Sequence, residues 1–138
     1  MVRAAVEAMA YQTRDVVDAM RSDAGIPMTE LKADGGASAM DVLLQFQADL
    51  LGVRVRRPRV LETTALGAAY LAGLGEGVWS GTAELAEHWQ EDRAFDPRPG
   101  DQADRKYRDW RRAVERALRW EEPPGPRSPE ESPATKLL

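Results

Sequence analysis

The sequence predicts a helix-rich α/β fold with a few short strands. Three observations indicate it: a long amphipathic helix opens the chain, a short apolar segment runs through two adjacent glycines into a second helix, and an alternating segment precedes a third helix. With 138 residues, 43% of them hydrophobic, the chain has the size of one domain and enough apolar residues to bury a core.

The first helix is expected from residue 1 to about residue 24. Its apolar residues recur every three or four positions, which predicts one buried stripe. The stripe consists of Val2, Val6, Met9, Thr13, Val16 and Met20. Gly25 and Pro27 then end the helix. No capping side chain precedes the pattern, so the helix resembles one that has been cut, as expected for a fragment.

A short strand at residues 30–34 is expected to lead into Gly35 and Gly36. Ser38, followed three residues later by Asp41, fits a variant of the capping box that opens a helix over residues 39–51. The predicted buried face of this helix consists of Leu43, Phe46, Leu50 and Leu51.

Later segments alternate between short strands, helices and loops. Residues 53–55 predict a strand that Pro58 closes. Thr63 or Thr64 caps a helix so rich in glycine and alanine that a close-packed core helix is expected. Further helices are predicted over residues 82–92, with Leu85 and Trp89 inward, and over residues 102–120. The inward face of the last helix consists of Tyr107, Trp110, Val114, Ala117 and Leu118.

Composition excludes several classes of site. There is no cysteine and a single histidine, His88, so neither a thiolate nor a histidine metal site is expected. The net charge of −4 argues against nucleic acid, and the basic cluster at residues 54–59 is interpreted as a solvated strand end. The acidic residues around His88 are interpreted as a solvated helix face. No apolar run reaches the roughly 20 residues of a membrane span, and a cytoplasmic protein is expected.

The pair Gly35-Gly36 has two interpretations. Glycine costs conformational entropy, so the pair indicates either a tight turn or the close approach of a ligand such as a nucleotide. The N-terminus of the following helix would favour an anionic oxygen. The segment is not a P-loop, because no Gly-Lys-Ser/Thr follows. It also lacks the third glycine and the acidic residue of the dinucleotide fingerprint.

Three segments in order carry a resemblance: "EAMAYQTRDVVDAM", "DGGASAMDVLLQFQADLLG" and "ETTALGAAYLAGLGEGVW". Together they resemble the C-terminal domain of the glycerol kinases, in the FGGY carbohydrate-kinase family, which has an actin/RNase H-like fold. The resemblance covers residues 1–122 and implies a truncated domain of that fold. Residues 123–138, rich in proline and glutamate, are expected to form a disordered tail.

The resemblance implies an ATP site with Mg²⁺. In the family, the second glycine of the turn lies against the nucleotide, a role that falls to Gly36 with Gly35 as its partner. Met40 stands where relatives often have an asparagine that reaches the nucleotide. No catalytic or metal-binding residue is expected, because the family's base and glycerol site lie upstream of the matching segment.

The expected function follows from that absence. The chain resembles the ATP-binding C-terminal part of an enzyme that converts ATP and glycerol to ADP and sn-glycerol 3-phosphate, inactive alone and taking glycerol only with the missing half. A non-catalytic nucleotide-binding or interaction module, or a remnant fragment, is the alternative. Self-association into a homo-oligomer is also expected, because a cut sheet exposes strand edges.

Overall fold

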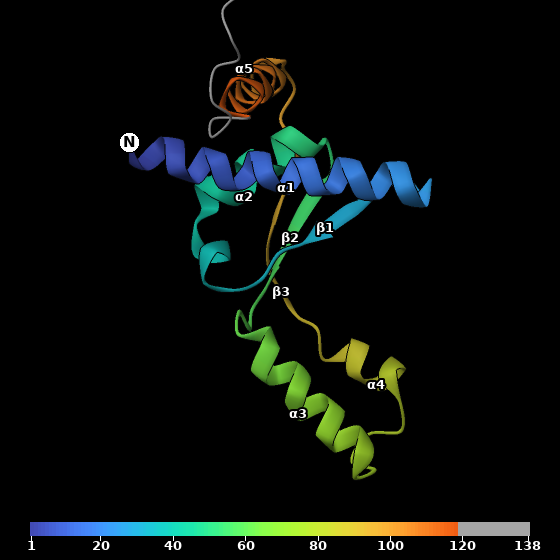
Figure 1. The fold of residues 1–138 in the computed structure, drawn as a ribbon. Helices are drawn as coiled ribbons and strands as arrows, with labels where there is room; N and C mark the ends of the chain where they lie inside the picture. Colours follow the sequence, from blue (N-terminus) through green and yellow to red (C-terminus); the bar gives the residue numbers. More distant parts are fainter. Residues whose placement is uncertain (119–138) are drawn as a thin grey trace, which may run out of the picture.

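The structure is a computed structural model, and it describes residues 1–118. In chain order (Figure 1) the elements are the helix α1 (Val2–Ala24), the strand β1 (Glu30–Lys32), the 3₁₀ helix η1 (Gly36–Ala39), the helix α2 (Asp41–Leu51), the strand β2 (Arg54–Pro58), the helices α3 (Thr63–Gly75) and α4 (Thr82–Glu87), the strand β3 (Glu91–Phe95) and the helix α5 (Gln102–Ala117).

Within residues 1–118 the sheet has three strands, in the order β1-β2-β3. β1 runs parallel to β2, with Leu31 opposite Val55, and α2 forms the crossover between them. β3 runs antiparallel to β2, with Val55 opposite Phe95. The prediction of a helix-rich α/β fold with a few short strands is therefore confirmed.

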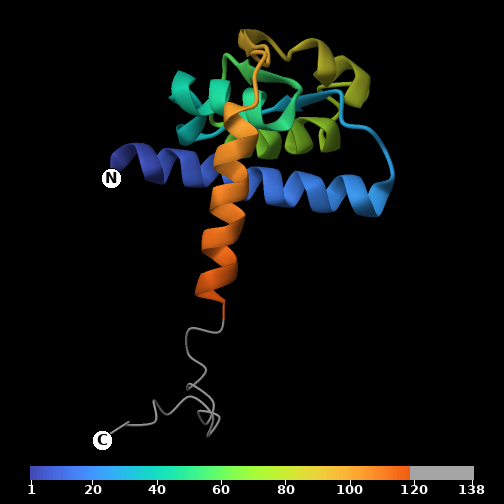
Figure 2. The same ribbon diagram turned by 90° about the horizontal axis from the view of Figure 1, so that it is seen from above.

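Two hydrophobic clusters hold the helices and the sheet together. One joins α1, α2 and α5 and consists of Ala10, Tyr11, Leu43, Leu50, Ala103 and Tyr107. The other lies between α2 and the sheet and consists of Leu44, Ala48, Val55 and Phe95. In Figure 2, α5 crosses α1, and the aromatic rings of Tyr11 and Trp110 stack at this crossing with centroids 5.4 Å apart.

The predicted buried stripe of α1 is wrong. Val2, Met9, Val16 and Met20 are exposed, whereas α1 buries Ala10, Tyr11 and Val17. Only the edge of the predicted stripe is covered: Val6 packs against the core cluster, and Thr13 accepts a hydrogen bond from the Gln47 side chain. The helix meets α2 and α5 instead through the neighbouring face, where the small side chain of Ala10 allows close approach.

The predicted capping box at the start of α2 is also wrong. The hydroxyl of Ser38 donates to the carbonyl oxygen of Gly35, 2.7 Å away, because Ser38 belongs to the preceding η1. Met40 occupies the N-cap position of α2 and supplies no side-chain hydrogen bond. Asp41 instead binds arginines of the sheet.

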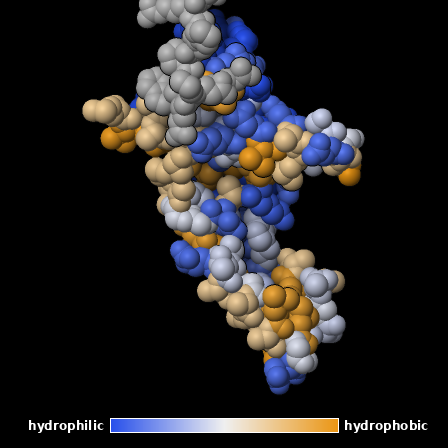
Figure 3. All heavy atoms as spheres, viewed as in Figure 1, coloured by the Kyte–Doolittle hydropathy of each residue, from blue (hydrophilic) through white to orange (hydrophobic). Residues whose placement is uncertain are grey.

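The expectation that α3 is a close-packed core helix does not hold, because α3 buries no residue. It extends away from the sheet (Figure 1), and its far end packs mainly on the side chain of Trp79. An added Cβ at Gly73 would lie 2.0 Å from that ring, so the small residue here accommodates one indole. Figure 3 shows an apolar patch over the end of the molecule where α3 lies.

The segment predicted as one helix over residues 82–92 is divided. α4 ends at Glu87, and the chain then enters β3, where Glu91 and Asp92 pair with arginines of β2. Leu85 and Trp89 are half-buried. In α5, Tyr107 is buried as expected, but Leu118 beyond its end is exposed. The predicted tail at 123–138 and the end of the helix predicted to residue 120 lie outside the described residues.

Candidate functional site: the glycine turn and the neighbouring hollow

The glycine pair forms the turn that connects β1 to η1. Gly35 has a φ of +78°, a left-handed conformation that favours glycine. Its amide donates to the carbonyl oxygen of Leu61, 2.9 Å away, which ties the turn to the segment before α3. Asp34, just before the pair, accepts a hydrogen bond from the hydroxyl of Thr63. The turn is thus held by the segment that leads into α3 and by the first residue of that helix.

The space in front of both glycines is open. A Cβ added at Gly35 or at Gly36 would meet no atom within 4 Å. Gly35 needs its positive φ, but the backbone at Gly36 does not demand a glycine. The turn therefore has room for a ligand to lie close against its backbone.

Arg57 of β2 braces the far side of the turn. Its Nη1 donates to the carbonyl oxygen of Ser38 at 3.0 Å and to the carboxylate of Asp41 at 2.8 Å. Its Nε donates to Asp92 at 2.7 Å. The hydrogen bonds to Asp92 and then to Asp41 raise the pKa of the Arg57 guanidinium, so this side chain stays charged.

Charge at the start of α2 bears on the kind of ligand that fits. Asp41 lies in the first turn of α2, and it binds both Arg57 and Arg93. The carboxylate therefore already occupies the positive end of the helix dipole. An acidic side chain of the chain itself thus lies at the helix end where the sequence led us to expect an anionic oxygen.

Met40 lies beside the turn but packs inward. Its side chain is half-buried against the cluster that contains Tyr11 and Leu43. The three residues predicted to contact a nucleotide therefore differ in placement: the backbone of Gly35 and Gly36 faces open space, whereas the thioether of Met40 belongs to the core.

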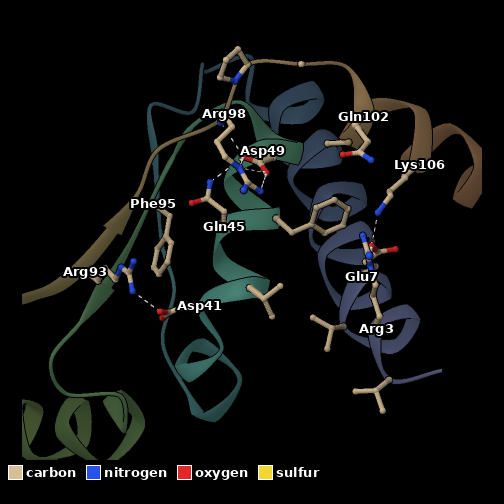
Figure 4. A pocket seen from close by; sticks show the side chains of 17 residues that line it. Arg3, Glu7, Asp41, Gln45, Asp49, Arg93, Phe95, Arg98, Gln102 and Lys106 are labelled. Atoms are coloured by element: carbon tan, nitrogen blue, oxygen red, sulfur yellow. Dashed lines mark hydrogen bonds and ion pairs between the residues drawn. The ribbon is translucent and has the colours of Figure 1, made fainter.

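A second feature is a hollow of about 940 Å³ between the first turns of α1, one side of α2, the strand β3 and the start of α5 (Figure 4). Apolar side chains of Val6, Val42, Phe46 and Phe95 line it, and ion pairs surround them. Asp41 is the link to the glycine turn, since it lines the hollow one residue after Met40.

The charged groups of the hollow are already paired. Arg98 donates to Asp49 at 2.6 Å, and Lys106 donates to Glu7 at 2.6 Å. For both carboxyl groups burial raises the pKa, but the hydrogen bonds from their basic partners outweigh it and hold the pKa below its ordinary value. A ligand would have to displace these partners to use the charges.

Sequence reasoning missed the hollow because its partners lie far apart in the chain. Asp49 belongs to α2 and Arg98 to the loop before α5, 49 residues further along the chain. Periodicity places residues on one face of one element, and it carries no signal for a pair between elements.

Within residues 1–118 there is no group of three or more histidine or acidic side chains arranged to hold a metal ion. In the same described part of the chain, no helix is both long and apolar enough to cross a membrane.

Comparison with known proteins identifies the chain's family. Residues 1–76 match the model of the C-terminal domain of the FGGY family of carbohydrate kinases. The chain belongs to this family. It is 55% identical over 123 residues to a glycerol kinase of Caldanaerobacter subterraneus subsp. tengcongensis and 57% identical over 121 residues to one of Symbiobacterium thermophilum. These matches include 88% and 87% of this chain, but only 25% and 24% of the relatives.

Solved structures agree with the sequence matches. The structure of Plasmodium falciparum glycerol kinase with ADP is 34% identical and superposes with a TM-score of 0.72, over 86% of this chain and 24% of that one. A xylulose kinase of Rhodospirillum rubrum is 27% identical, with a TM-score of 0.66 over 83% of this chain and 24% of that chain. The expected sugar-kinase fold is confirmed, and the chain spans about a quarter of the length of the glycerol kinases that it matches.

Proposed function

We propose that this chain is the nucleotide-binding C-terminal part of an ATP-dependent glycerol kinase. Gly35 and Gly36 contact the nucleotide through their backbone, and the open space at Gly36 is the observation that carries the proposal. Family membership and the glycerol kinase crystallised with ADP support ATP or ADP as the ligand. A cytoplasmic location accords with such an enzyme.

The turn fits the nucleoside end of ATP better than its phosphates. Asp41 already lies at the dipole of α2, and the space beside the two glycines accepts a flat, uncharged group against the backbone. Met40 supports the turn from the core, so among the three residues its side chain contributes least to contact with the nucleotide. Mg²⁺, when present, would be held mainly by the phosphates of ATP, as is usual for this ion.

Phosphoryl transfer from ATP to glycerol depends on positioning both substrates and stabilising charge. The described residues supply the glycine turn, and we assign no residue among them to the base or to the glycerol site. Formation of ADP and sn-glycerol 3-phosphate therefore requires a further part of a glycerol kinase, and the chain alone is expected to be inactive.

Calorimetric titration with Mg-ATP, together with a glycerol-dependent assay of ADP release, tests the proposal. We expect saturable binding of Mg-ATP without turnover. Gly36→Val should abolish binding, because the new side chain occupies the open space, where an added Cβ meets no atom of the fold within 4 Å. Turnover by the chain alone would contradict the assignment of the base to another part of the kinase.

Gly75→Val is the matched control. It adds the same side chain at the far end of α3, where a new Cβ also meets nothing within 4 Å. Binding that survives in this variant but not in Gly36→Val would place the nucleotide at the turn. Equal binding by both variants would remove the glycine pair from the site.

A non-catalytic interaction module is the second candidate function. The exposed apolar side chains of α1 and α3, such as Val16 and Leu71, favour it, because uncovered apolar surface marks contacts with another polypeptide. Lack of nucleotide binding by an otherwise folded chain would favour this candidate.

A further inference from the structure

The hollow beside the glycine turn has the size and the lining of a small-molecule site. Its volume of about 940 Å³ lies at the upper end of the range for ligand pockets. Apolar side chains from three elements line it: Val6 from α1, Phe46 from α2 and Phe95 from β3. Val42, which also lines it, is 68% exposed. The fold therefore leaves apolar side chains open to solvent within a concave surface.

The charge that lines the hollow has the opposite sign to the charge of the whole chain. Four basic and three acidic side chains line it, whereas the chain carries a net charge of −4. One of the three acidic side chains, Asp41, also binds Arg57, which braces the glycine turn. The hollow therefore favours an anionic group over a cationic one.

Two cations share one carboxylate at one side of the hollow. Glu7 accepts a hydrogen bond from the Nε of Arg3 at 2.9 Å and from the Nζ of Lys106 at 2.6 Å, and Figure 4 shows these side chains together. Lys106 can therefore turn to a ligand while Arg3 keeps Glu7 paired. Asp49 differs, because it is only 11% exposed and the cation bound to it is Arg98. Drawing Arg98 away would leave a mostly buried carboxylate without its cation.

Lys106 lies over one of the aromatic rings that line the hollow. Its Nζ is 5.4 Å from the centroid of the Phe46 ring, and its side chain is 28% exposed. A carboxylate bound to Lys106 would therefore place its own apolar body against Phe46. The hollow thus combines a cation that can be released from its partner with an apolar wall directly beneath it.

We propose that the hollow binds a small amphiphilic carboxylate, whose anionic group pairs with Lys106 and whose apolar body packs against Phe46 and Val6. The class is that of a medium-chain fatty acid or another apolar carboxylate of similar size. A hydrogen bond between two charged groups is stronger than a neutral one, so Lys106 is the anchor, and the apolar lining selects against a small polar anion. This site goes beyond the proposed nucleotide contact and does not depend on it.

Calorimetric titration of the chain with octanoate, octanol and octylammonium tests the proposal. The three probes share an apolar chain of similar length and differ in the charge of the head group. We expect saturable binding of octanoate, about tenfold or more tighter than binding of the other two. The methyl resonances of Val6 and Val42 should shift with octanoate, whereas those of Leu71 on α3 should not.

Substitutions of Lys106 separate the anchor from the overall charge of the chain. Lys106→Gln should weaken octanoate binding about tenfold or more, and the fold should persist because Arg3 keeps Glu7 paired. Lys106→Arg retains the charge and should retain binding. Arg105→Gln is the matched control, because it removes the same charge from the neighbouring residue of α5, whose pair with Asp101 lies on the surface. It should leave binding unchanged.

Three results would overturn the proposal. They are absence of saturable octanoate binding, binding of octanol or octylammonium as tight as that of octanoate, and equal affinities of Lys106→Gln and Arg105→Gln for octanoate. Gly36→Val should bind octanoate as tightly as the unaltered chain, because Gly36 is not among the residues that line the hollow. Failure of nucleotide binding at the turn and failure of octanoate binding in the hollow are therefore separate results.

Discussion

Arg57 of β2 holds the carbonyl oxygen of Ser38 at 3.0 Å, and Ser38 closes the turn that the glycine pair begins. The same guanidinium reaches Asp41 at the start of α2 and Asp92 of β3. Its side chain is only 12% exposed. One residue therefore joins the sheet, the turn and the second helix, and the position of Gly36 depends on it.

Replacing this arginine should loosen the turn. Arg57→Ala removes hydrogen bonds to two carboxylates and to two backbone carbonyl groups, and we expect the free energy of unfolding to fall by about 2 kcal/mol. Urea unfolding measures the loss, and exchange of the Ser38 amide should accelerate. Arg105→Ala is the control: its pair with Asp101 lies on the surface, so a change of at most about 0.5 kcal/mol is expected. Equal losses in both variants would contradict the bracing role.

The presence of the main helices and of the glycine turn could be predicted from the sequence, because both depend on residues that are close together along the chain. Gly25 and Gly52 end their helices in left-handed conformations, and the sequence predicted this helix end at Gly25. The covered side of α1 could not be predicted, because periodicity identifies an apolar face but not the element that covers it. The role of Asp41 was missed for a related reason: Arg57 and Arg93, which hold it, are distant in sequence.

The low burial of α3 predicts a contrast between two leucines. Leu44 in α2 is 1% exposed, and Leu44→Ala should cost about 2–5 kcal/mol through lost burial and a cavity. Leu71 in α3 is 72% exposed, so Leu71→Ala should change stability by no more than about 0.5 kcal/mol. Urea unfolding of both variants checks this contrast. A large loss for Leu71→Ala would show that α3 packs on the domain or on another chain in solution.

The pair between Asp49 and Arg98 predicts a loss of stability in acid. Burial alone would raise the pKa of Asp49, but the hydrogen bonds from Arg98 lower it below the ordinary 3.8. Its contribution to stability is therefore present above about pH 3.8 and is lost as the pH falls through the folded-state pKa. Asp49→Asn should cost about 1–3 kcal/mol at pH 7, and less at pH 3. Urea unfolding at both pH values measures the difference.

Asp109→Asn is the control for this acid effect. Asp109 pairs with Arg112 within α5, and both side chains are more than half exposed. Its removal should shift stability little at either pH. A cost for Asp49→Asn that stays constant between pH 7 and pH 3 would show that packing of the side chain, rather than its charge, stabilises this region.

Tyr11 predicts a second loss of stability, in alkali. Burial, and then the nearby carboxylate of Glu7, raise the pKa of Tyr11 from 10.0 to about 12. The folded state therefore keeps a proton that the unfolded state loses, so this stabilisation is complete below pH 10 and disappears as the pH rises through about 12. A shift of this size corresponds to about 2–3 kcal/mol. Burial and the hydrogen bond to Asp15 also raise the pKa of Tyr107, which adds to the loss of stability in alkali.

Tyr11→Phe tests this alkaline effect. As the pH rises from about 9 to about 12, the free energy of unfolding should fall less in this variant than in the unaltered chain, and urea unfolding across that range measures the difference. Parallel curves for the two proteins would mean that Tyr11 ionises in the folded chain as freely as in the unfolded one, and that it is open to solvent rather than packed between α2 and α5.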